Sequence, residues 1–336
     1  MLRHLVLAGI AGTVAFAAPA KAQEPDTILN VSYDVGRELY TAASEAFAKS
    51  WKAQTGKDIK VNQSNAGTST QARLILEGLE ADVVTFNQVT DVQILHERGR
   101  LIPADWQKRF PNNSSPYYSL PAFVVRAGNP KNIKNWDDLT RSDVQAIFPN
   151  PKTSGNARYT YLAAYAFALD KFGGDEAKAD AFVKQILANV PVFDTGGRGS
   201  TTTFVENGKG DVLITFESET NLIVEKAGAD KYQVVVPPAS LLAEFPVALI
   251  DKVVDKRGSR PVATAFLNYL YSPEGQDILL KFNNRVNNQS LMEARKSQFP
   301  DVKLYRVEDV FGGWEKVTKV HFGSTGKIEK LMPTGR

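Results

Sequence analysis

Short apolar stretches alternate with amphipathic stretches along most of the chain. Apolar and β-branched stretches predict strands, and apolar residues spaced three or four apart predict helices, as Leu39, Ala43 and Phe47 do. The expected strands cover residues 28–33, 59–63, 82–86, 120–125, 144–148, 191–194, 211–216 and 245–250. The expected helices cover residues 37–51, 70–79, 157–170, 201–207, 217–227 and 260–271. This recurrence of strand, polar loop and helix predicts an α/β protein with a parallel sheet.

The order of these segments predicts two lobes. A chain of 336 residues usually forms two domains. Two strongly apolar segments, residues 119–125 and 243–250, suit passages of the chain between the lobes. Residues 119–246 would then form one lobe, and residues 23–118 would join with 247–336 to form the other.

The first residues predict an export signal instead of a part of the fold. Arg3 precedes a short apolar run, and Ala20-Lys21-Ala22 supplies the small residues of a cleavage site. A membrane anchor is the alternative, but the apolar run is short for a span. We therefore expect cleavage near Ala22, removal of residues 1–22, and a mature protein in the periplasm.

Charge, cysteine and histidine content narrow the chemistry. Removing residues 1–22 takes away two basic residues and no acid, so the formal charge falls from +3 to +1, and nothing points to nucleic acid as a partner. The absence of cysteine excludes disulfides, a thiol nucleophile and thiolate metal sites. His96 and His321 lie far apart in the mature sequence, which disfavours a metal site or a Ser-His-Asp triad. No cofactor is expected.

Four polar loops stand where a strand gives way to a helix. They contain Asp34, Thr68-Ser69, Ser154-Gly155-Asn156 and Gly197-Arg198-Gly199-Ser200. The first amides of a helix have no partner within it and, together with the helix dipole, favour an anion. Glycine lets the backbone approach a ligand closely, and Ser or Thr adds a hydroxyl donor. Because such loops gather at the carboxyl ends of the strands, the pattern indicates a small anion held between the lobes.

Ordinary helix capping is the alternative explanation for each loop taken singly. Thr68, Ser154 and Ser200 are good N-cap residues. The repetition of the same composition in four loops favours the anion. The acidic residues Glu217 and Glu219 are interpreted as solvated residues at a helix start, without a catalytic role.

Motifs for nucleotide binding and for serine hydrolysis are incomplete. Gly326-Lys327 is followed by isoleucine where a phosphate-binding loop needs Ser or Thr, and Gly197-Arg198-Gly199 does not continue as a dinucleotide motif. Gly67-Thr68-Ser69 lacks the second glycine of a hydrolase nucleophile elbow. The loops therefore predict binding rather than catalysis.

A series of motifs runs along the chain in the order found in one known family. The motifs are Leu29–Asp34, Arg37–Tyr40, Ala81–Thr85, Val125–Pro130, Trp136–Leu139, Pro149–Gly155, Gly197–Phe204, Gly210–Leu213, Tyr271–Gln276 and Phe311–Trp314. Together they resemble the periplasmic sulfate-binding proteins of sulfate/thiosulfate ABC importers, over residues 28–321. The resemblance implies a two-lobed type II periplasmic binding protein fold of the α/β class, in which each lobe is a mixed sheet flanked by helices.

The resemblance also implies a non-enzymatic receptor that closes on one dehydrated oxyanion, held mainly by uncharged donors. Carried over position by position, the ligand-binding residues are Asp34, Thr68, Ser154, Gly155, Asn156, Gly197 and Phe216, with Ser69, Arg198 and Ser200 in support. The expected ligand is sulfate or thiosulfate. The expected partner is an inner-membrane ABC permease, and a monomer without a nucleic-acid partner is expected.

Several of these positions depart from the family pattern. Phe216 stands where the family has a tryptophan whose indole N–H donates to the anion, and Thr68 replaces a serine. Asn156 replaces a glycine, and its amide offers a compensating donor. The departures leave phosphate, molybdate or a sulfonate open as ligands. A periplasmic ester hydrolase is the alternative from another class, and the scarcity of histidine and cysteine disfavours it.

Overall fold

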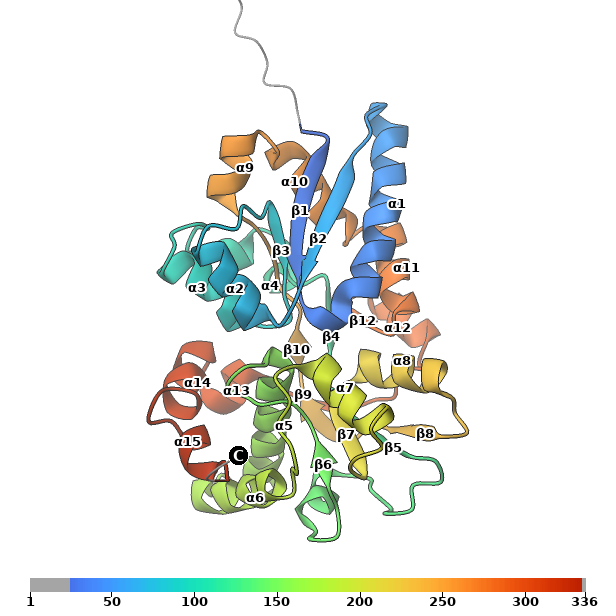
Figure 1. Cartoon of the computed structure of the whole chain (residues 1–336), viewed down its shortest axis with the longest axis vertical. Coiled ribbons are helices and arrows are strands. Elements are labelled where there is room, and N and C mark those ends of the chain that lie inside the picture. The colour runs from blue at the N-terminus through green and yellow to red at the C-terminus, as the bar shows by residue number, and fades with distance from the viewer. Residues whose placement is uncertain (1–24, 334–336) are drawn as a thin grey trace, which may run out of the picture.

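The computed structural model describes residues 25–333 of the chain, and the expected signal segment with its cleavage near Ala22 lies outside this range. Figure 1 shows two lobes, one above the other, with a few strands running between them. No helix in residues 25–333 combines the length and the apolar character needed to cross a bilayer.

The first lobe is built on a four-stranded sheet of order β11-β3-β1-β2. Strands β1 (Thr27–Ser32), β2 (Lys60–Asn65) and β3 (Val83–Thr85) are parallel, and β11 (Val247–Leu249) is antiparallel to β3. The helices of this lobe are α1 (Arg37–Thr55), α2 (Thr68–Leu76), α3 (Val89–Glu97), α4 (Pro111–Ser114), α9 (Asp251–Arg257), α10 (Arg260–Tyr269) and α11 (Pro273–Lys281). The carboxyl ends of β1, β2 and β3 point toward the second lobe (Figure 1).

The second lobe repeats this plan with a sheet of order β6-β7-β5-β8. Its strands are β5 (Pro121–Arg126), β6 (Ala146–Ile147), β7 (Val212–Phe216) and β8 (Tyr232–Val235). Its helices are α5 (Gly155–Lys171), α6 (Glu176–Ala188), α7 (Gly197–Val205) and α8 (Glu217–Ala227). Since β5 is antiparallel to β7 while β6 is parallel to it, this sheet is mixed, as the first one is.

A small antiparallel sheet of order β10-β4-β12 lies between the lobes (Figure 1). It consists of β4 (Tyr117–Ser119), β10 (Ala243–Glu244) and β12 (Arg285–Val286). The expected passages contain β5, β10 and β11. A third passage follows β12, because β13 (Lys303–Tyr305) pairs with β9 (Ala239–Leu241).

The C-terminal segment differs from the expected division, which places all of residues 247–336 in the first lobe. After α12 (Gln289–Ala294) and β13, the helices α13 (Val307–Phe311), α14 (Trp314–His321) and α15 (Lys327–Leu331) lie beside α5 and α6 of the second lobe (Figure 1). The hydroxyl of Tyr161 on α5 bonds Nδ1 of His321 at 2.9 Å, and the Lys327 ammonium contacts Asp180 on α6 at 2.9 Å. These two contacts, the first of them buried, hold the segment to the second lobe.

One expected strand, residues 191–194, is irregular in the structure. Pro191 has no N–H to give to a sheet ladder, so the segment pairs only at its two ends. There the amide of Ala146 donates to the carbonyl of Asn189 at 3.0 Å, and the amide of Asn150 donates to that of Asp194 at 2.8 Å. Short 3₁₀ helices, η1 (Asp34–Gly36), η2 (Trp106–Lys108) and η3 (Trp136–Thr140), complete the secondary structure.

Candidate functional site

The starts of α2 and α5 face each other across the two lobes. A Cβ placed on Gly155, the first residue of α5, would lie 3.4 Å from Oγ1 of Thr68, the first residue of α2. The same Cβ would lie 2.7 Å from Oδ1 of Asn87. Only glycine allows this approach, so the sequence positions of Thr68 and Gly155 bring two helix N-termini to one place.

The start of α7 lies next to the start of α5. A Cβ on Gly197 would lie 3.6 Å from Nδ2 of Asn156 and 3.6 Å from Val35. Asp34 joins this group through its side chain, since Oδ2 accepts the amide hydrogen of Arg198 at 3.4 Å and Oδ1 accepts that of Val35 at 3.0 Å. Because the carboxylate accepts these amide hydrogens, the donor that Asp34 can offer a ligand is its main-chain N–H.

The N-cap residues of these three helices make no capping bond with their own side chains. The N-cap residues of α2 and α7 are Gly67 and Gly196, which have no side chain to cap with, and Ser154 makes no side-chain cap bond to α5. The hydroxyl of Ser200 lies inside α7 and bonds Asp194 at 3.2 Å. Within the described residues, no N-cap side chain satisfies the first amides of α2, α5 and α7, which suit an anion. At α7 the amide of Arg198 is bonded to the Asp34 carboxylate from the first lobe.

The hydroxyls of Thr68 and Ser69 are already bonded to the Asp91 carboxylate. Oγ1 of Thr68 donates to Oδ2 of Asp91 at 2.6 Å, and Oγ of Ser69 donates to Asp91 at 3.0 Å. The Arg158 guanidinium, from α5, lies 3.6 Å from the Asp91 carboxylate on α3. The Thr68 hydroxyl, expected from the sequence to serve the ligand, is therefore bonded to Asp91. Asp91 and Arg158 were not predicted, because contacts between distant elements leave no local pattern in the sequence.

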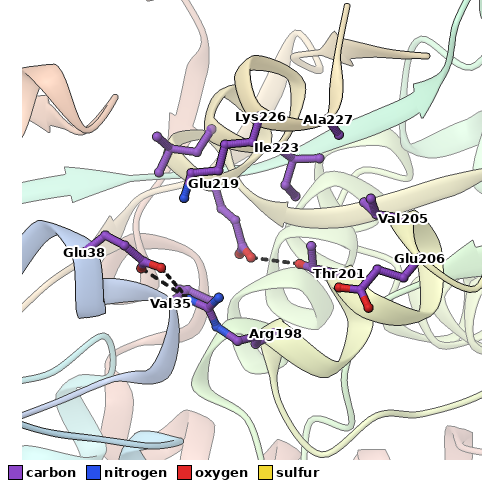
Figure 2. Close-up of a pocket in the computed structure, with 11 residues that line it drawn as sticks. Val35, Glu38, Arg198, Thr201, Val205, Glu206, Glu219, Ile223, Lys226 and Ala227 are labelled. Carbon is purple, nitrogen blue, oxygen red and sulfur yellow. Dashed lines mark hydrogen bonds and ion pairs between the residues drawn. The ribbon is translucent and has the colours of Figure 1, made fainter.

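Asn156 begins a hydrogen-bond relay that leads away from the helix starts. Its Nδ2 donates to Oγ1 of Thr215 at 2.8 Å, and Thr215 is in turn bonded to Oε2 of Glu219. Oε1 of Glu219 accepts from Thr201 at 2.9 Å, as Figure 2 shows. Oδ1 of Asn156 is buried and has no hydrogen-bond partner among the described residues.

Glu217 and Glu219 are buried, so their interpretation as solvated residues was wrong. Glu217 is fully buried and Glu219 is 9% exposed. Burial raises the pKa of the Glu219 carboxyl, and the nearby charge of Asp34 raises it further, while hydrogen bonds from Thr215 and Thr201 lower it. Glu219 also lines a cavity of about 230 Å³ between the lobes, together with Glu38, Arg198, Glu206 and Lys226 (Figure 2).

Phe216 lies in a cluster of aromatic rings at the end of β7. Its ring centroid is 5.0 Å from that of Phe245 and 5.9 Å from that of Tyr159, and Tyr33 contacts Phe245 at 5.4 Å. The sequence places Tyr33 next to Asp34, and Tyr159 lies one helical turn after Gly155 and Asn156 on α5. Phe216 therefore adds an apolar aromatic surface where an indole would add a donor.

Two ion pairs join the lobes around the helix starts. Arg198 on α7 lies 3.2 Å from Glu38 on α1, and Arg158 pairs with Asp91 as described above. Both cations thus have carboxylate partners from the opposite lobe. Residues 25–333 hold no cluster of His, Cys, Asp or Glu that could bind a metal ion.

Comparison with known proteins identifies close relatives. Residues 35–282 match the family of bacterial extracellular solute-binding proteins. A thiosulfate-binding protein of Escherichia coli K12 is 57% identical over 92% of both chains. A sulfate-binding protein of the same organism is 46% identical over 96% of this chain and 98% of its own.

Solved structures agree with this result. The sulfate-binding protein SubI from Mycobacterium tuberculosis superposes with a TM-score of 0.78 at 32% identity, over 88% of this chain and 99% of its own. The periplasmic binding protein AfuA from Actinobacillus pleuropneumoniae, at 19% identity and a TM-score of 0.60, shows the fold alone. The predicted α/β periplasmic binding protein fold is confirmed, and the relatives are named as binding proteins and not as enzymes.

Proposed function

The chain belongs to the family of sulfate- and thiosulfate-binding proteins, and from this premise we propose that it is the periplasmic solute receptor of an ABC importer, with thiosulfate as its preferred ligand and sulfate as its second. The observation that carries the proposal is the meeting of α2, α5 and α7 at Thr68, Gly155 and Gly197, whose N-cap side chains make no capping bonds. Helix starts without N-cap bonds provide main-chain donors to one anion and no fixed positive charge.

A fully ionised anion suits this donor set. Sulfate and thiosulfate carry no proton near neutral pH, so each of their acceptor atoms can take a hydrogen bond. Hydrogen phosphate also needs an acceptor, and the carboxylate of Asp34 already accepts from Val35 and Arg198. The unpartnered Oδ1 of Asn156 is an acceptor that favours phosphate, so phosphate is the alternative to sulfate and thiosulfate.

Phe216 favours thiosulfate over sulfate. The terminal sulfur of thiosulfate is larger and accepts hydrogen bonds more weakly than oxygen, so it needs contact surface more than a donor. The aromatic cluster around Phe216 supplies such a surface. Thiosulfate-binding relatives from Escherichia coli K12 and Pseudomonas aeruginosa, at 57% and 48% identity, support the same choice.

Transport follows from the two-lobed arrangement. We expect the lobes to close when the anion contacts amides from both of them, and the closed monomer to dock on an inner-membrane permease. We expect the signal segment to direct export to the periplasm and to be removed there by cleavage near Ala22. The ion pairs Arg198–Glu38 and Arg158–Asp91 join residues of opposite lobes, so we expect them to assist closure.

Titration calorimetry on ligand-stripped protein tests the proposal with thiosulfate, sulfate, phosphate, molybdate and a sulfonate. Thiosulfate and sulfate should bind, with thiosulfate the tighter. Binding of phosphate or molybdate without sulfate would overturn the assignment. The hydrolase alternative would be supported by turnover of a chromogenic sulfate or phosphate ester above background.

Replacing Phe216 with tryptophan should shift the preference toward sulfate. An indole N–H donating to the anion is one hydrogen bond to a charged group, worth about 1.5–3 kcal/mol, or roughly ten- to hundredfold in the affinity ratio of sulfate to thiosulfate. Phe216→Leu is the matched control, because it removes the ring without adding a donor. An unchanged ratio in the tryptophan variant would show that Phe216 does not set the choice of ligand.

A further inference from the structure

The loop between β3 and α3 reaches the place where the starts of α2 and α5 meet. It consists of Phe86, Asn87 and Gln88. Oδ1 of Asn87 lies 3.1 Å from Oγ1 of Thr68, and it would lie 2.7 Å from a Cβ on Gly155. The carboxamide of Asn87 therefore lies against the first residue of a helix from each lobe, although this loop is not one of the four polar loops expected to hold the anion.

The single proton of the Thr68 hydroxyl decides the orientation of the Asn87 amide. Oδ2 of Asp91 lies 2.6 Å from Oγ1 of Thr68, and the Asn87 carboxamide lies 3.1 Å from it. The proton goes to Asp91, because that contact is the shorter one and a carboxylate paired with Arg158 can only accept. Oγ1 must then accept from Asn87, so a half-turn that places Nδ2 toward Thr68 satisfies both bonds. The two ends of an amide are nearly equal in size, so the half-turn needs no other movement.

The Asn87 amide has more donors than the chain uses. Its nitrogen carries two N–H groups, of which Thr68 accepts one. With Oδ1 toward Thr68 instead, both N–H groups are without an acceptor among residues 25–333. Asn87 is 4% exposed, so in either orientation this buried side chain offers a donor whose acceptor must come from outside the chain.

Gln88 makes the same point independently. It is 0% exposed, and neither Oε1 nor Nε2 has a hydrogen-bond partner among the described residues. It is the N-cap residue of α3 but makes no capping bond, and its Cβ would lie 3.0 Å from the Cβ on Gly155. Buried amides without partners are rare in folded proteins, because their lost bonds to water are not replaced. Two neighbouring carboxamides with unused groups therefore indicate a place that a ligand completes.

The charged groups at this loop balance each other. Asp91 accepts from Thr68 and from Ser69, and its carboxylate lies 3.6 Å from the Arg158 guanidinium. The pair carries no net charge, and the carboxamides carry none. An anion bound here is therefore met by neutral N–H donors, as it is at the helix starts.

Resting on the proposed function, in which the starts of α2 and α5 hold the anion, we propose that Asn87 is a further anion-binding residue: its Nδ2 donates one hydrogen bond to Thr68 and one to the anion. A hydrogen bond to a charged group is stronger than one to a neutral group. An amide nitrogen only donates, so Asn87 favours an anion whose outer atoms all accept, as those of thiosulfate and sulfate do. Nδ2 gives hydrogen phosphate no acceptor for its proton.

Titration calorimetry with thiosulfate tests the contact. Asn87→Ala removes the donor and should weaken binding by roughly ten- to hundredfold, as the loss of one hydrogen bond to a charged group would. Gln93→Ala is the matched control. Gln93 also carries a carboxamide and lies on α3, but it is bonded to Trp106 and Glu97 within the first lobe, so its removal should leave the affinity unchanged.

Asn87→Asp separates a ligand contact from a structural role. The variant keeps the size of the side chain and an acceptor, and it replaces the donor by a carboxylate. If Asn87 served only as an acceptor for Thr68, this variant would leave the choice among anions unchanged. We expect instead that hydrogen phosphate gives its proton to the new carboxylate, so the affinity ratio of phosphate to thiosulfate should rise by about tenfold or more.

The outcomes distinguish this inference from the proposed function. If the native protein binds neither thiosulfate nor sulfate, the proposed function fails and the inference falls with it. If it binds them, but Asn87→Ala binds as tightly as Gln93→Ala or Asn87→Asp leaves the ratio unchanged, only the contact assigned to Asn87 is overturned. If Asn87→Asp does not fold, the comparison of Asn87→Ala with Gln93→Ala decides the matter alone.

Discussion

Glu217 and Glu219 lie in the same first turn of α8, and both are buried, yet their surroundings differ in kind. The Arg285 guanidinium holds Glu217 from β12 with two hydrogen bonds, of 2.6 and 2.8 Å. Glu219 faces the other lobe and is bonded to the hydroxyls of Thr201 and Thr215. The helix start favours a negative charge at both positions, so the partner makes the difference. Glu217 is bonded to a guanidinium, whereas the hydroxyls around Glu219 can bond its carboxyl with or without a proton.

The largest effect on stability should come from breaking the Glu217–Arg285 ion pair. Glu217→Gln leaves the buried Arg285 cation without its counter-charge and should lower the free energy of unfolding by about 3–5 kcal/mol, measured by urea denaturation. The double variant Glu217→Leu with Arg285→Met removes both charges and should recover most of this loss. A single variant as stable as the native protein would show that the pair does not secure β12 to α8.

A second test concerns the effect of burial on the pKa of His321. Burial, and next the charge of Lys327, lower the pKa of His321 to about 4. The unfolded chain takes up this proton near pH 6.5, so stability is full above about 6.5 and falls as the pH drops to about 4, by about 3 kcal/mol in all. His321→Phe should remove this part of the pH dependence in unfolding curves. An unchanged slope would mean that His321 is protonated in the fold.

A single added methyl group at Gly155 should push the starts of α2 and α5 apart. Gly155→Ala would put a Cβ 2.7 Å from Oδ1 of Asn87 and should oppose closure of the lobes. A clash of this kind costs about 1–3 kcal/mol, which lowers anion affinity roughly ten- to hundredfold in calorimetry. Gly67→Ala is the control, since its nearest contact would be 3.8 Å from the carbonyl of Thr153. Equal affinities for the two variants would contradict the close approach of α2 and α5.

The smallest effect should come from the exposed pair between the lobes. Arg198→Ala removes the 3.2 Å contact with Glu38, and an exposed pair contributes at most about 1 kcal/mol. Anion affinity should fall by about fivefold or less at low salt, and the difference should shrink as salt rises. A larger loss that persists at high salt would place Arg198 at the ligand.

The sequence predicted the helix starts to within two to four residues, because their signal is local. Thr68 and Gly155 follow strands and precede helical stretches, so the α/β order brings them to one edge. Gly197 follows the irregular residues 191–194 instead of a strand. Phe216 was predicted as a site residue only through the family resemblance, because a phenylalanine at the end of a strand does not by itself indicate a binding site. The fold was predictable for the same reason, except for residues 191–194, where Pro191 breaks the ladder.

The sequence could not reveal the relay or the partner of Glu217. Two acids at a helix start satisfy the helix dipole equally well in solvent or in a core, and the residues that bury them come from elsewhere. Arg285 and Thr201 reach these acids only through tertiary contacts. The same holds for the C-terminal helices, whose attachment to the second lobe depends on the pairing of β13 with β9.

The three-stranded sheet β10-β4-β12 has a mechanical consequence. A single connecting strand would let one lobe twist freely about it, and each further strand bonded alongside removes rotational freedom. With three strands side by side, bending across the sheet is the remaining soft motion. The receptor should therefore sample conformations that differ mainly in one bending angle between the lobes. A membrane partner then needs to distinguish only how far the two lobes are closed.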